Sequence, residues 1–197
     1  MTPDELSYLK SHCPHLSADY LSYFKSFRLR PADHIHVDFK RESDERDMGE
    51  LHLQIRGLWV ETTMYEIPVL AIISEAYFRF CDTNWKHDGQ LNAARIKGMQ
   101  LEDGDCSFSE FGTRRRRDYQ TQGIVMEGLK SSATFAGTSN VHFAMKMNLK
   151  PIGTVAHEWF MGIAAITNDY EHANELALRY WVETFGPGVR KSGKSCE

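Results

Sequence analysis

The spacing of apolar residues predicts helices at the start of the chain and antiparallel strands after them. Residues 1–28 carry apolar side chains at roughly helical intervals, and Pro14 divides this region into two short helices. Residues 34–39 and 51–57 alternate polar and apolar positions, as half-buried strands do. The charged residues 40–47 between them indicate a loop. We therefore expect these strands to pair in an antiparallel way.

The middle of the chain predicts one extended piece and two helices, and it shows no metal-binding pattern. Residues 59–64 indicate a short extended segment, whereas residues 66–80 carry a strongly apolar pattern that predicts a helix. A further helix is expected over residues 91–99. The histidines of the first strand, His34 and His36, fall on its polar face, so we expect them to face solvent rather than a metal ion.

Beyond residue 104 the pattern changes to strands and helices in alternation, which predicts a parallel sheet or barrel. The expected order is strand 108–111, helix 118–129, strand 134–135, helix 139–147, strand 152–155, helix 158–167 and helix 170–185. We expect an N-terminal α+β region over residues 1–104, the first part of a (β/α) barrel over residues 105–188, and a divergent tail over residues 189–197. Three units of one strand and one helix cannot close a barrel of eight strands.

Composition narrows the class of protein. The chain has 197 residues, of which 42% are hydrophobic and 25% are charged, as in soluble globular proteins. A net charge of −4 argues against general binding to nucleic acid or to membrane surfaces. The longest apolar run, residues 67–73, is too short to span a bilayer. The four cysteines lie far apart and lack metal spacing, so we expect free thiols in a reducing compartment, the cytoplasm.

Candidate chemistry lies at three strand-to-helix junctions, which converge on one rim in an α/β barrel. His157 follows a short apolar stretch, and a neutral imidazole can attack a phosphoryl group while the adjacent Glu158 holds its tautomer. The alternative for His157 is a buried histidine bonded to backbone. Thr154, just before it, is either a strand residue or a hydroxyl offered to substrate.

The other two junctions carry an arginine run and a turn of small residues. Residues 114–117 are four arginines, which fit a solvated helix start or a nucleic-acid patch. Because the helix dipole disfavours cations in a first turn, a carboxylate or phosphate ligand is a further interpretation. Phe111 fits either a core position or stacking on a planar ring. Residues 137–140 fit a helix cap, and such helix starts also bind anions.

Several of these segments together resemble nicotinate phosphoribosyltransferases, above all the fungal type. The resemblance covers most of residues 1–188 and is carried by the segments 26–29, 59–62, 66–68, 73–78, 108–117, 137–140 and 151–159. It implies an irregular (β/α) barrel of the type II phosphoribosyltransferase kind. It also implies an ATP-coupled enzyme, acting with Mg²⁺, that joins nicotinate to phosphoribosyl pyrophosphate and gives nicotinate mononucleotide and pyrophosphate.

The resemblance also implies roles for individual residues. His157 is the position phosphorylated by ATP, and Thr154 contacts nicotinate. By analogy with the related nicotinamide enzyme, Phe111 stacks on the pyridine ring and Arg114 lies beside it. The nicotinamide enzyme has an aspartate in the turn that holds Ser139 here. A serine hydroxyl can donate to the carboxylate of nicotinate, whereas an aspartate would repel it.

Family members are about twice as long as this chain and are expected to form homodimers. The segments that complete the ring sandwich and the phosphoribosyl site have no match here, so we expect a truncated chain with little activity alone. The alternative is a non-catalytic paralogue that binds and modulates a full-length enzyme. We expect the protein in the cytoplasm, with the nucleus as a second compartment, and we expect no nucleic-acid or membrane partner.

Overall fold

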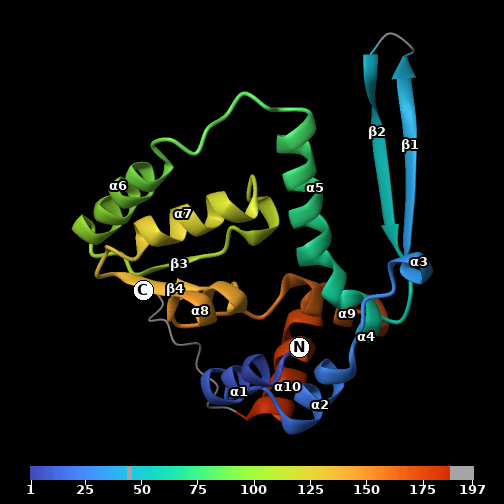
Figure 1. The fold of residues 1–197 in the computed structure, drawn as a ribbon. Helices are drawn as coiled ribbons and strands as arrows, with labels where there is room; N and C mark the ends of the chain where they lie inside the picture. Colours follow the sequence, from blue (N-terminus) through green and yellow to red (C-terminus); the bar gives the residue numbers. More distant parts are fainter. Residues whose placement is uncertain (44–45, 187–197) are drawn as a thin grey trace.

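A computed structural model describes residues 1–43 and 46–186 (Figure 1). An N-terminal helical and hairpin region leads through a long helix, α5, into a region of parallel strands and helices. The elements are α1 (Pro3–His12), α2 (Ala18–Ser26), α3 (Pro31–His34), β1 (Ile35–Ser43), β2 (Arg46–Ile55), α4 (Trp59–Thr62), η1 (Thr63–Tyr65), α5 (Glu66–Phe80), α6 (Gln90–Asp103), β3 (Phe108–Glu110), η2 (Thr113–Arg115), α7 (Tyr119–Leu129), β4 (Phe135–Thr138), α8 (Val141–Met147), α9 (His157–Thr167) and α10 (Ala173–Phe185).

The first two helices confirm the expected pair. Thr2 caps α1, because its hydroxyl accepts from Glu5 N at 3.2 Å while the Glu5 carboxylate accepts from Thr2 N at 2.6 Å. Leu9, Cys13 and Leu21 are buried between α1 and α2 and form a small core. The capping residues therefore fix where each helix begins, and the buried residues fix how the helices pack.

Strands β1 and β2 form the expected antiparallel ribbon, which extends away from the helical part (Figure 1). Ile35 pairs with Ile55 and Phe39 with Leu51, so apolar side chains share one face. The ribbon is longer than predicted, because residues 40–43, expected in a loop, continue β1. Charged side chains were compatible with a strand here because the outer face of the ribbon is open to solvent.

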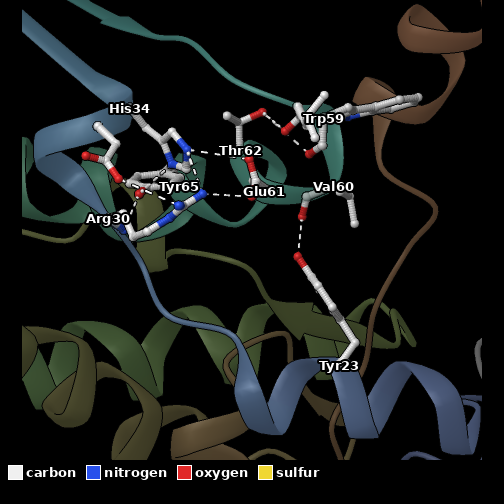
Figure 2. A network of polar contacts seen from close by, with 10 residues as sticks. Tyr23, Arg30, His34, Trp59, Val60, Glu61, Thr62 and Tyr65 are labelled. Carbon is white, nitrogen blue, oxygen red and sulfur yellow. Dashed lines mark hydrogen bonds and ion pairs between the residues drawn. The ribbon is translucent and has the colours of Figure 1, made fainter.

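The histidine prediction was wrong for His34 and right for His36, which is exposed. His34 ends α3 and is only 6% exposed. Its Nδ1 lies 3.0 Å from the hydroxyl of Tyr65, and its Nε2 lies 3.6 Å from Glu61 (Figure 2). His34 therefore lies just outside the ribbon, in a helical turn that packs against the segment leading into α5, which alternation alone could not reveal.

The segment before α5 also differs from its prediction. Residues 59–64, expected to be extended, form α4 and most of η1. Thr62 N donates to the carbonyl oxygen of Leu58 at 3.0 Å, closing the first helical turn. Helix α5 itself has the expected bounds; its Ala71 is buried, whereas Ile72 and Phe80 are exposed. A helix of four residues is too short for its period to be read from sequence.

The second region contains two of the three expected strands. Strands β3 and β4 pair in parallel, and each is followed by a helix, α7 and α8 (Figure 1). The third expected strand, residues 152–155, is absent; only an isolated parallel bridge joins Pro151 to Thr138. Ile152 N donates to Thr138 O at 2.9 Å, and then the chain leaves the sheet before α9. Proline at this point removes one ladder donor, which shortens the pairing.

The last helix of the described chain is α10. Helix α10 begins at Ala173, three residues later than expected, and ends at Phe185 as expected; Gly186, which follows it, has a φ of 80° that suits a residue without a side chain. No helix in residues 1–43 and 46–186 is both long and apolar enough to cross a membrane. The boundary near residue 104 stays a prediction, and the tail of residues 189–197 lies outside the described residues.

Candidate functional site at the strand ends

The carboxyl ends of β3 and β4 are joined by a buried carboxylate, Glu110, which is only 8% exposed. Its Oε2 accepts from the Thr138 hydroxyl at 2.6 Å, and its Oε1 accepts from Gly112 N at 2.6 Å and from Gln122 Nε2 at 3.1 Å. Ser139 N donates to the carbonyl oxygen of Glu110 at 2.9 Å. The junctions after the two strands therefore share one hydrogen-bonded framework.

Thr113 extends this framework to the turns above the strands. Its hydroxyl accepts from Gln122 Nε2 at 2.8 Å and from Asn140 Nδ2 at 2.9 Å. Asn140 also caps α8, because its Oδ1 accepts from Phe143 N at 3.1 Å. The helix cap expected within residues 137–140 is therefore Asn140, the last of these residues. Both strand-to-helix junctions are thus held in place by buried and half-buried side chains.

Three of the predicted site residues lie around these junctions. Phe111 directly follows β3 and is 46% exposed, so its ring is not a core residue. Arg114 lies in η2, and Ser139 directly follows β4 with a half-buried side chain. Since β3 and β4 are parallel neighbours, the structure brings Phe111, Arg114 and Ser139 to the same edge of the sheet.

The arginine run precedes helix α7, in agreement with the predicted helix over residues 118–129, so it does not form the first turn of that helix. Asp118 caps α7, and carboxylates of α5 compensate the arginines. Arg114 Nη1 donates to Glu66, and Arg116 Nη2 lies 4.0 Å from Glu75. The guanidinium of Arg117 lies 5.2 Å from the ring centre of Phe78, also on α5. The run therefore anchors the turn after β3 to α5.

The third junction places Thr154 and His157 after the Pro151 bridge. Thr154 is exposed and lines a cavity of about 940 Å³ that His12, His15 and Trp181 also line. His157 is exposed at the first position of α9, which excludes the alternative of a buried histidine. Within the described residues, no hydrogen bond or ion pair joins Thr154 or His157 to the other three predicted residues.

The expected role of Glu158 as the partner of His157 was wrong. Both carboxylate oxygens of Glu158 accept from residues before α5: Oε1 from Trp59 Nε1 at 2.5 Å and Oε2 from Thr63 Oγ1 at 3.1 Å. Neither this contact of Glu158 nor the hydrogen bonds of Glu110 were predicted from the sequence. The only signal for Glu110 was a charged residue at the end of an apolar strand.

The described residues contain no group of three or more histidines, cysteines, aspartates or glutamates that could hold a metal ion. The rim, by which we mean the edge of the sheet that carries Phe111, Arg114 and Ser139, instead offers an exposed aromatic ring, a guanidinium and a hydroxyl at the ends of parallel strands. Such a set can stack on a planar ring and donate hydrogen bonds to an acid group. By its fold and its polar edge, the protein belongs to the α/β class in which ligands bind at the carboxyl ends of strands.

Comparisons with known proteins identify the family within this class. Residues 106–191 match the nicotinate phosphoribosyltransferase family, and residues 1–74 match the N-terminal domain of nicotinate phosphoribosyltransferases. The chain therefore belongs to the nicotinate phosphoribosyltransferase family. It comprises an N-terminal domain and the start of the catalytic domain, as the superposed structures show.

The relatives span fungi and bacteria. A Schizosaccharomyces pombe protein described as a probable nicotinate phosphoribosyltransferase is 45% identical over 96% of this chain and 47% of its own length. A Saccharomyces cerevisiae protein crystallised as a nicotinate phosphoribosyltransferase is 41% identical, with a TM-score of 0.89 over 94% of this chain and 47% of its own. The Porphyromonas gingivalis enzyme is 33% identical, with a TM-score of 0.84 over 94% of this chain and 46% of its own. The chain thus spans about half the length of the relatives it matches.

Proposed function

We propose that the protein acts in nicotinate phosphoribosyl transfer, in which nicotinate and phosphoribosyl pyrophosphate give nicotinate mononucleotide and pyrophosphate with coupling to ATP. The observation that carries this proposal is the rim shared by Phe111, Arg114 and Ser139 in a chain of this family. The pyridine nitrogen of nicotinate attacks the anomeric carbon of the ribose, and the bond to pyrophosphate breaks with both electrons leaving on its oxygen. The protein contributes mainly by holding the two reactants in line.

The rim residues suit nicotinate by shape and charge. The ring of Phe111 is 46% exposed and can stack on the pyridine. Arg114 has five N–H donors, and the contact with Glu66 uses Nη1, which leaves the others for the carboxylate of the substrate. The hydroxyl of Ser139 donates to the same carboxylate, and Thr154 supplies a further hydroxyl. An amide in place of the acid loses the charge-assisted bond to Arg114.

His157 is the proposed phosphate acceptor in the step that couples ATP. An imidazole nitrogen attacks the γ-phosphorus of ATP, ADP leaves, and the phosphorylated histidine is later hydrolysed. His157 is exposed and begins α9, whose first backbone N–H groups have no side-chain cap. A phosphate at this point gains from these N–H groups and from the helix dipole.

The proposed reaction also involves a magnesium ion, and the protein is proposed to act as a dimer. Mg²⁺ neutralises pyrophosphate in such reactions, but the described residues form no acidic cluster that fits it, so we assign no ligand and no step to the ion. We propose that this chain alone turns over slowly, because two paired parallel strands do not enclose a phosphoribosyl site. We further propose that the protein forms a homodimer and is located in the cytoplasm, with the nucleus as a second compartment.

Calorimetric titration of the chain with nicotinate and with nicotinamide tests the proposed site. We expect nicotinate to bind at least about tenfold more tightly than nicotinamide, and Arg114→Ala to remove most of that preference. Arg179→Ala is the matched control, because Arg179 is an exposed arginine on α10. Equal affinity for both ligands, or an unchanged preference in Arg114→Ala, contradicts the proposal. Nicotinate binding without turnover, together with an altered rate of an added full-length enzyme, favours the modulating paralogue.

A further inference from the structure

The start of α9, which carries His157, is tied to the N-terminal domain through the carboxylate of Glu158. Trp59 Nε1 donates to Oε1 at 2.5 Å and Thr63 Oγ1 donates to Oε2 at 3.1 Å. Both donors come from the α4–η1 segment, at least 95 residues earlier in the chain. Both oxygens of the carboxylate are therefore engaged, and both by the same short segment.

The α4–η1 segment is itself held firmly, so it can serve as an anchor. Glu61 accepts from Arg30 Nη2 at 2.7 Å, and the carbonyl oxygen of Val60 accepts from the hydroxyl of Tyr23 at 2.8 Å. Figure 2 shows Arg30 beside Glu61 on one side of α4, Tyr23 below Val60, and the side chain of Trp59 pointing away from Arg30. The donors to Glu158 are thus fixed by contacts with α2 and with the segment before α3.

Packing of aromatic rings also holds α9 against α4. The rings of Trp59 and Trp159 are stacked, with centroids 5.9 Å apart and planes inclined by 23°. A Cβ atom at Gly162 would come within 2.3 Å of Trp59 Cη2, so the close approach of α9 requires glycine at that position. Trp159 Nε1 donates to Ala177 O at 3.0 Å, which fixes the ring from the other side. The contacts place the first turns of α9 directly against α4.

The sequence around His157 gives α9 little support of its own. Ala156, the residue before the helix, makes no side-chain cap, and the segment before it has only the single bridge at Pro151. A helix terminus without a cap frays readily. The negative charge of Glu158, in the first turn, also interacts favourably with the helix dipole. The hydrogen bonds of Glu158, together with the stacking of Trp59 on Trp159, therefore fix the turn on which His157 stands.

We propose that Glu158 is a positioning residue that fixes the imidazole of His157 by anchoring the first turn of α9 to Trp59 and Thr63. This inference rests on the proposed role of His157 as phosphate acceptor. Because an imidazole on a frayed turn samples many orientations, loss of the anchor slows attack on phosphorus and leaves the affinity for ATP unchanged. Glu158 acts through His157 and does not itself touch the reacting atoms.

Three substitutions in the full chain separate this role from a general loss of stability. Trp59→Phe keeps a ring but removes the Nε1 donor, Thr63→Val removes the hydroxyl, and Thr63→Ser retains it. Glu183→Gln, an exposed carboxylate on α10, is the control. Measurements are amide hydrogen exchange in the first turn of α9, the ¹⁵N spectrum of the His157 imidazole, and single-turnover formation of phosphohistidine from ATP.

We expect Trp59→Phe and Thr63→Val to speed exchange of these amides and to slow phosphohistidine formation, each by about tenfold, with an unchanged dissociation constant for ATP. Thr63→Ser and Glu183→Gln should behave as the unmodified chain. Unchanged exchange and an unchanged imidazole spectrum in Trp59→Phe and Thr63→Val overturn the inference. If the unmodified chain forms no phosphohistidine, the proposed function of His157 fails, while exchange and the spectrum still decide whether Glu158 positions the imidazole.

Discussion

At the scale of single residues, Glu110 shows how one buried carboxylate can organise a rim. It accepts from a hydroxyl, a side-chain amide and a backbone N–H that belong to different elements. Thr138, which donates the hydroxyl, is fully buried, and Gln122 is 4% exposed. The donors of Thr138 and Gln122 are shielded from water, so removal of the carboxylate leaves them without an acceptor, and the contact matters more for stability than an exposed pair does.

We therefore expect Glu110→Ala to lower the free energy of unfolding by about 2–4 kcal/mol, since it leaves buried donors without acceptors. Glu127→Ala, which changes an exposed carboxylate on α7, should cost less than about 0.5 kcal/mol. Urea denaturation followed by circular dichroism measures both. Equal costs for the two variants would show that the Glu110 framework does not stabilise the rim.

At the scale of elements, helix α7 depends on its cap, Asp118. Its carboxylate accepts from Thr121 N at 2.5 Å, and His87 Nε2 lies 3.2 Å from the other oxygen. Burial acts to raise the pKa of Asp118, but the hydrogen bonds from Thr121 and the contact with His87 outweigh it and lower the pKa below the ordinary 3.8. The folded state therefore favours the ionised carboxylate.

Because the folded pKa of Asp118 lies below the unfolded one, its ionisation stabilises the protein above about pH 4, and this contribution is lost as the pH falls through the folded pKa. Asp118→Ala should cost about 1 kcal/mol near pH 7 and less near pH 3. Asp88→Ala, in the exposed loop before α6, is the control. A cost that does not shrink in acid contradicts the assignment.

Long periodic elements were predictable, and short ones were not. Helix α5 has its predicted bounds because fifteen residues carry a clear pattern with proline near the start. Residues 59–62 form a helix of one turn, for which no period exists, and residues 152–155 fail as a strand because pairing stops after Pro151. Both errors concern segments whose conformation is set by contacts with distant elements, here Glu158 and Thr138.

At the scale of the whole molecule, the site was predictable in part. The junctions that carry Phe111, Arg114 and Ser139 were expected to meet because parallel strands end at one edge, and the structure brings them there. The side-chain contacts of Arg114 and Glu158 were not predictable, since their partners lie 48 and 95 or more residues away in the chain. Spacing within a motif contains no information about such distant partners.

The molecule also leaves several large apolar side chains exposed to solvent. On the β1–β2 ribbon, Val37 is 62% exposed and Phe39 is 52% exposed, and both lie on the face opposite Asp38. Helices α5 and α9 expose further large apolar side chains, including Ile72 at 67% and Ile166 at 70%. Exposed apolar patches and unpaired strand edges promote association.

The chain on its own should therefore associate as its concentration rises, which size-exclusion chromatography with light scattering measures directly. Changing Val37 and Phe39 together to lysine should reduce association, because charge on an exposed apolar face opposes its burial. Asp38→Lys places the same charge on the opposite face of the ribbon and should leave association largely unchanged. If the double variant associates as strongly as the unmodified chain, the apolar face of the ribbon is not the cause, and the exposed faces of α5 and α9 become the surfaces to test.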